Sequence, residues 1–91
     1  MLPLELDITP EANDVTVEWG QVTNATSYSV SFSTNSDETG MFYTDTTAGT
    51  SYELTGELSP STNYWVRVIP LNAGVEISGT SSGWVAFTTT A

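Results

Sequence analysis

Carboxylates and aromatic rings are the side chains most able to do chemistry in this sequence. The chain has eleven Asp and Glu residues, a single basic residue in Arg67, and neither His nor Cys. Catalysis needs a nucleophile with a base, a tuned acid pair or a metal. The acids that alternate with apolar residues face solvent instead of a cleft: Glu5, Asp7, Glu18 and Glu53. We therefore expect a noncatalytic protein with no catalytic residue, no cofactor and no metal site.

Two short acidic segments, Asp37-Glu38 and Glu11 to Asp14, could hold a cation loosely. Neither has the ligand spacing of a calcium-binding loop. The alternative interpretation is that these are solvated turn residues.

Net charge limits the partners. The formal charge is −10, and a protein that binds phosphate backbones needs clustered Lys and Arg. The chain would be repelled by nucleic acid and by an anionic bilayer, so we expect neutral or basic partners. Carboxylates a strand apart repel one another, which predicts a fold that added salt stabilises.

Four residues near the C-terminal half form a candidate interaction face. Period-two alternation places Trp65, Arg67 and Ile69 on the outer side of one strand and Trp84 beside them on the next. One interpretation is structural, with the guanidinium stacked on an indole. The other is a ligand platform, because exposed aromatic and apolar side chains bind sugars or protein partners.

The elements that would position these residues are short strands. Alternating apolar residues predict an all-β fold with seven strands, and no window has a helical stripe. The strands cover residues 4–8, 15–19, 28–33, 41–44, 51–54, 64–70 and 84–88. Residues 71–83 read as a long loop, and the facing of 41–44 is undecided. Because Pro70 cannot donate a ladder hydrogen bond, we expect its strand to end or bulge there.

A turn followed by a buried strand stands between residues 58 and 68. Leu58 and Pro60 end one segment, and Tyr64 opens the next, with Val66 and Val68 alternating after it. This pattern is typical of a tyrosine corner, in which the ring is buried and the hydroxyl bonds the backbone a few residues upstream. It predicts a Greek-key β-sandwich.

The whole chain resembles a fibronectin type III domain. The resemblance rests on Trp19 ending the second strand, on Tyr28-x-Val30-x-Phe32, on the Leu58 to Val68 pattern and on Asn72-x-Gly74. It implies sheets A-B-E and C′-C-F-G, with Trp19, Tyr28 and the inner side of strand F in the core. In the cytokine-receptor branch of this family, tryptophans interleave with arginines of strand F. Ser82-Gly83-Trp84 opposite Arg67 resembles one rung of that arrangement.

These observations lead to one expectation about function. We expect residues 1–91 to be one fibronectin type III-like domain excised from a longer multidomain protein. Its role would be a monomeric spacer or protein-interaction module in contact with neighbouring domains. The Ser- and Thr-rich, lysine-free composition favours an extracellular or cell-surface microbial protein. The alternatives are a module that binds carbohydrate or protein through the face around Trp65 and Trp84 or through its loops, and an engineered binding scaffold.

Overall fold

The computed structural model describes residues 4–77 and 79–91 and is built from short antiparallel strands with one turn of 3-10 helix. The alternating apolar residues give strands because each strand buries one face and leaves the other toward solvent. The elements are β1 (Asp7–Pro10), β2 (Val15–Glu18), β3 (Ser27–Ser33), η1 (Glu38–Gly40), β4 (Met41–Thr47), β5 (Ser51–Leu54), β6 (Asn63–Asn72), β7 (Val75–Glu76) and β8 (Val85–Thr88).

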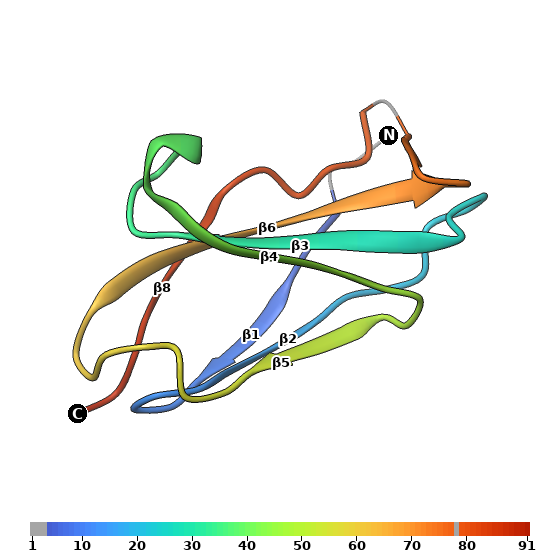
Figure 1. The fold of residues 1–91 in the computed structure, drawn as a ribbon. Helices are drawn as coiled ribbons and strands as arrows, with labels where there is room; N and C mark the ends of the chain where they lie inside the picture. The colour runs from blue at the N-terminus through green and yellow to red at the C-terminus, as the bar shows by residue number, and fades with distance from the viewer. Residues whose placement is uncertain (1–3, 78) are drawn as a thin grey trace.

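Two sheets face each other in a sandwich (Figure 1). One has the order β1-β2-β5, and the other has the order β4-β3-β6, with both β7 and β8 paired to β6. These are the predicted A-B-E and C′-C-F-G sheets. The described strands number eight instead of seven because strand G is split into β7 and β8. The core between the sheets consists of Val15, Val17, Trp19, Tyr28, Val30, Phe32, Leu54, Leu58, Tyr64, Val66, Val68 and Phe87.

The tyrosine corner is present. The hydroxyl of Tyr64 accepts a hydrogen bond from the backbone N–H of Ser59 at 2.9 Å, and the ring stacks on Phe87 with centroids 5.9 Å apart. Leu58 is buried beside it, while Pro60 lies exposed at the turn. The corner therefore ties the segment before β6 to the first residues of that strand.

Trp19 and Tyr28 are both buried, as the resemblance implied. Their rings meet edge to face with centroids 5.4 Å apart, a favoured geometry for aromatic pairs. The Tyr28 hydroxyl accepts the backbone N–H of Val22 at 2.9 Å. Trp19 itself lies just past the end of β2, and its backbone N–H donates to the carbonyl of Thr50.

The prediction that strand F ends or bulges at Pro70 was wrong. β6 continues to Asn72, and Pro70 stays in register with Tyr28 of β3. The carbonyl of Pro70 accepts a hydrogen bond from Ile77, on the side of strand G. In an antiparallel strand the N and O of one residue point the same way, so the missing donor costs β6 no bond to β3.

Other boundaries also differ from the predicted ones. The range 71–83 is not one loop, because it contains the end of β6 and the short β7. β1 starts at Asp7 because its pairing with β2 begins there, and β8 starts after Trp84. β4 runs to Thr47, with Tyr43 opposite Phe32 and a register shift next to it.

Candidate functional site

The outer face of the five-stranded sheet carries the four residues of the candidate interaction face. Alternation along β6 puts Trp65, Arg67 and Ile69 on that side, opposite the three serines of β3 that share it. Trp84 lies in the segment that leads into β8. All four side chains are half-buried. The structure therefore brings together the residues that the alternation grouped, but none of their side chains is fully exposed to solvent.

Arg67 is held between a ring and a carboxylate. Its guanidinium carbon lies 4.5 Å from the centroid of the Trp84 ring, and its Nη1 donates to Oε1 of Glu38 at 2.7 Å. An exposed cation–π contact contributes about 0.5–1 kcal/mol, and a surface ion pair about 0–1 kcal/mol. The stack expected between Arg67 and Trp84 is present, and the two contacts fix the single basic side chain of the sequence.

Glu38 is the partner that sequence reasoning missed. It lies on η1, inside a segment that reads only as a polar turn, and it is 29 residues from Arg67 in the chain. Asp37 caps η1 by accepting the backbone N–H of Thr39, which leaves the neighbouring Glu38 to reach the sheet. The cap sets the position of η1, but no local pattern says which strand it will cover.

Trp84 reaches Arg67 through the register of β8, because Val85 pairs with Val66 and the residue before Val85 therefore lies opposite Arg67. Farther along, strand G bulges. Glu76 pairs with Leu71 and Val85 pairs with Val66, so strand G advances nine residues while β6 advances five, and strand G has four extra residues. At this bulge, Ser82 restores hydrogen bonding between strand G and β6. Its hydroxyl accepts the N–H of Val68 at 2.9 Å, and its own N–H donates to the carbonyl of Val68 at 3.0 Å.

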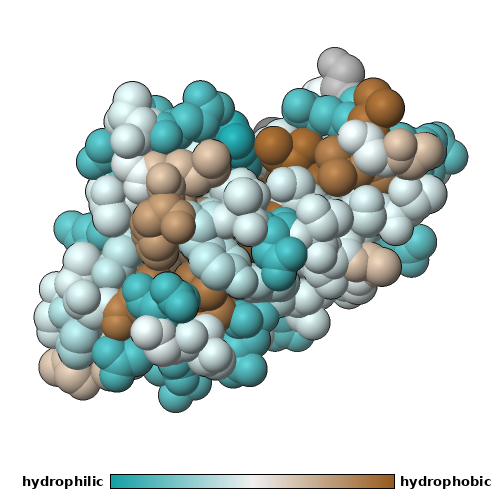
Figure 2. Space-filling model, in the orientation of Figure 1, coloured by the Kyte–Doolittle hydropathy of each residue, from teal (hydrophilic) through white to brown (hydrophobic). Residues whose placement is uncertain are grey.

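An apolar patch lies at the far end of the same sheet. Figure 2 shows hydrophobic atoms gathered at the upper right, where Figure 1 places the end of β6 and the β7 hairpin. Val75 is 69% exposed there, and Ile69, Leu71 and Ile77 are half-buried. Ala73 and Gly74 both have positive φ in the two-residue turn, as a type I′ hairpin requires.

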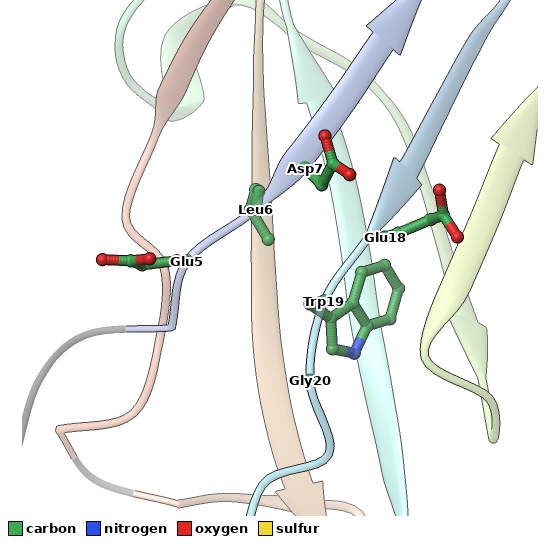
Figure 3. Close-up of a pocket in the computed structure, with 6 residues that line it drawn as sticks. All are labelled: Glu5, Leu6, Asp7, Glu18, Trp19 and Gly20. Atoms are coloured by element: carbon green, nitrogen blue, oxygen red, sulfur yellow. The ribbon is translucent and has the colours of Figure 1, made fainter.

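An acidic hollow opens where β1 and β2 separate. It has a volume of about 460 Å³ and is lined by Glu5, Leu6, Asp7, Glu18, Trp19 and Gly20. Asp7 and Glu18 are directly opposite each other in the register, and Figure 3 shows their carboxylates turned away from the Trp19 ring. The indole N–H of Trp19 is buried and has no hydrogen-bond partner in the part of the chain that the structure describes. Alternation placed the acids outside, but it did not predict the hollow.

Two tyrosines bridge the open side of the sandwich. The hydroxyls of Tyr43 on β4 and Tyr52 on β5 lie 2.6 Å apart, and the Tyr52 hydroxyl donates to Oδ2 of Asp45 at 2.8 Å. Burial first, and then the hydrogen bonds with Tyr43 and Asp45, raise the pKa of Tyr52 far above its usual value. The Tyr52 bond, together with the backbone N–H of Thr46, lowers the pKa of Asp45. Neither tyrosine was singled out from the sequence.

The described ranges 4–77 and 79–91 contain no group of three His, Cys, Asp or Glu side chains placed to hold a metal ion. Of the two acidic segments, Asp37 is engaged in the η1 cap, and Asp14 accepts the backbone N–H of Gly56 at 3.0 Å. Within the same ranges no helix has the length and apolar character to cross a membrane.

Solved structures share this arrangement of strands. The FN1–FN3 domains of chicken CNTN1 match all of this chain with a TM-score of 0.80 and 18% identity. The chain has the fibronectin type III fold. It spans 31% of that chicken chain. Domains of this fold are typically noncatalytic modules of larger proteins with structural or interaction roles.

Two further fibronectin type III neighbours match over most of their length. The FN5 domain of Drosophila Lar has a TM-score of 0.67 and 20% identity, and the match covers 98% of this chain and 95% of that one. The 6th fibronectin type III domain of human fibronectin type III domain containing protein 3 has a TM-score of 0.66 and 29% identity, over 98% and 83%. No family model matches the sequence, and no curated protein does.

Proposed function

We propose that this chain is a noncatalytic spacer or protein-interaction module within a longer, extracellular microbial protein. The observation that carries this proposal is the placement of the chain ends. The C-terminus lies at one end of the molecule and the first described residues lie toward the other (Figure 1), and the principal extents of the molecule are 38 × 24 × 21 Å. A domain with its ends placed this way increases the distance between the neighbouring domains of the longer protein.

Charge supports an extended arrangement of such modules. Each copy carries a formal charge of −10 with a single basic residue, so copies of the domain repel one another and stay monomeric. The same charge favours neutral or basic partners over nucleic acid or an anionic membrane. The Ser- and Thr-rich, lysine-free composition favours a location outside the cell or at its surface.

Small-angle scattering of two copies joined in tandem tests the spacer role. If the module is a spacer, the maximum dimension of the tandem exceeds that of one copy by close to the 38 Å long extent. The single copy, measured in the same buffer, is the control. A tandem that is little longer than one copy would mean that the domains fold back on each other, and the spacer proposal would fail.

A second candidate function is a ligand platform for a polysaccharide or a protein on the outer face of the five-stranded sheet. Trp65 and Ile69 keep part of their surface exposed there, beside the row of serines on β3. Stacking of a neutral ligand on an indole would change tryptophan emission. Titration with soluble polysaccharides tests this, with Trp65→Ala and Trp84→Ala expected to abolish the response. A response that survives both substitutions would place the ligand elsewhere.

A further inference from the structure

We propose that Tyr43 and Tyr52 form an oxidative cross-linking site, at which a one-electron oxidant of the haem peroxidase class, with hydrogen peroxide, joins the two rings as dityrosine. The tyrosines stand on β4 and β5, each at an edge of its own sheet. The bond would therefore tie the two sheets together on the open side of the sandwich. Both rings are half-buried, so their edges remain within reach of an oxidant.

The two rings are already placed as the product needs them. Their hydroxyls lie 2.6 Å apart, and their centroids lie 6.3 Å apart at an interplanar angle of 48°. In dityrosine the new bond joins the carbons ortho to the hydroxyls, so the two hydroxyl groups stay neighbours. Coupling then requires the ring edges to approach each other, without turning either ring over.

Asp45 supplies a place for a phenolic proton. A tyrosine hydroxyl has one hydrogen, and that of Tyr52 is donated to Asp45. Tyr43 must therefore be the donor in its bond to Tyr52. Because Asp45 also accepts the backbone N–H of Thr46, it stays a carboxylate. Oxidation of Tyr52 can then pass its proton along an existing hydrogen bond.

The reaction balances with one molecule of peroxide. The oxidised haem removes one electron from each tyrosine in turn, and each phenol loses its proton, first to Asp45 and then to solvent. The two phenoxyl radicals couple through their ortho carbons. The hydrogen on each of these carbons then moves to the oxygen of its ring and restores both phenols. The protein loses two hydrogen atoms in total, and the peroxide is reduced to two molecules of water.

The other two tyrosines are arranged differently, which makes the site selective. Tyr28 and Tyr64 are buried, and their hydroxyls accept backbone N–H groups from Val22 and Ser59. Neither hydroxyl is bonded to another tyrosine in the described part of the chain. The sequence has no cysteine, so a disulfide cannot form, and the Tyr43–Tyr52 pair offers a covalent tie of another kind.

The test is treatment of the dilute native protein with a haem peroxidase and hydrogen peroxide. We expect a monomer that has lost two hydrogen atoms in intact-mass measurement, shows dityrosine fluorescence, and yields a fragment in which the peptides of Tyr43 and Tyr52 are joined. A bond found only between molecules, or equally at Tyr28 or Tyr64, would overturn the proposal. Failure to cross-link while the tyrosines are oxidised would overturn it as well.

Substitutions sharpen this test. Tyr43→Phe and Tyr52→Phe keep a ring packed against the core and should each abolish the intramolecular bond, whereas Tyr28→Phe should leave it intact. Asp45→Asn removes the proton acceptor and should slow the reaction severalfold without preventing it. A product that still forms at the parental rate in Tyr43→Phe would show that another residue couples to Tyr52 and would refute the assignment.

Discussion

The two outer faces of this sandwich are built from similar strands but differ in what occupies them. On the three-stranded sheet, the row formed by Asp7, Glu18 and Ser51 stands exposed, with two carboxylates side by side. On the five-stranded sheet, the corresponding positions carry the half-buried Trp65 and Arg67, and serines of which Ser31 and Ser33 are buried.

The difference lies in what folds over each face. On the described part of the five-stranded sheet, η1 brings Glu38 to Arg67, and the segment that leads into β8 brings Trp84 over the same side chain. On the three-stranded sheet Asp7 and Glu18 gain no ion pair among the described residues. Alternation decides which side chains point outward, and the connecting segments decide which of them gain partners.

The largest expected effect on stability comes from Arg67→Ala, on the outer face of the five-stranded sheet. The change removes the Trp84 stack, the bond to Glu38 and the packing of the side-chain stem, which together contribute about 1–2 kcal/mol. Chemical denaturation should show that loss in the free energy of unfolding. Arg67→Lys, which keeps the charge but not the planar group, should lose less. Equal stability of Arg67→Ala and the parent would mean that the contacts stabilise nothing.

The next effect is a gain in stability, and it concerns the outer face of the three-stranded sheet. Glu18→Lys places a cation opposite Asp7 and should stabilise the fold by about 0.2–1 kcal/mol. Glu76→Lys is the matched control, because it also changes the net charge from −10 to −8 but stands opposite Leu71. Chemical denaturation measures the free energy of unfolding of both variants. If it rises equally in both, the gain comes from the change in total charge and not from the Asp7–Glu18 contact.

A smaller effect is expected in the acid limb of the stability curve. Hydrogen bonds from Thr39 lower the pKa of Asp37, and those from Tyr52 and Thr46 lower the pKa of Asp45. A carboxylate with a lowered folded pKa stabilises the fold above its unfolded value near 3.8, and this stability is lost as the pH falls through the folded pKa. Melting midpoints measured below pH 4 should therefore fall less steeply in Asp37→Asn and Asp45→Asn. Slopes equal to the parent's would count against these bonds.

The smallest expected effect is that of salt. Added sodium chloride at neutral pH should stabilise the parent by a few tenths of a kcal/mol, because it screens the repulsion among exposed carboxylates. Glu18→Lys should respond less, since one repelling contact has become attractive. Melting curves at low and high salt measure the difference, and a larger response in Glu18→Lys would contradict the repulsion between Asp7 and Glu18.

Much of the fold could be predicted from the sequence, and less of the candidate site. Apart from the undecided facing of residues 41–44, the strand faces, the tyrosine corner at Tyr64 and the grouping of Arg67 with Trp84 follow from short-range patterns, and the structure confirms them. The continuation of β6 past Pro70 did not follow. Whether a proline costs a strand a hydrogen bond depends on which neighbour its nitrogen faces, and that is a property of the assembled sheet.

The sequence by itself determined the all-β class, the inner and outer sides of every predicted strand except residues 41–44, and a net charge of −10. These are consequences of residue type and a repeat of two. Only the tertiary structure decided that Glu38 meets Arg67, that an acidic hollow opens beside Trp19, and that Tyr43 meets Tyr52. Each of those features depends on where turns and connecting segments lie in the folded chain, and side-chain alternation carries no information about their positions.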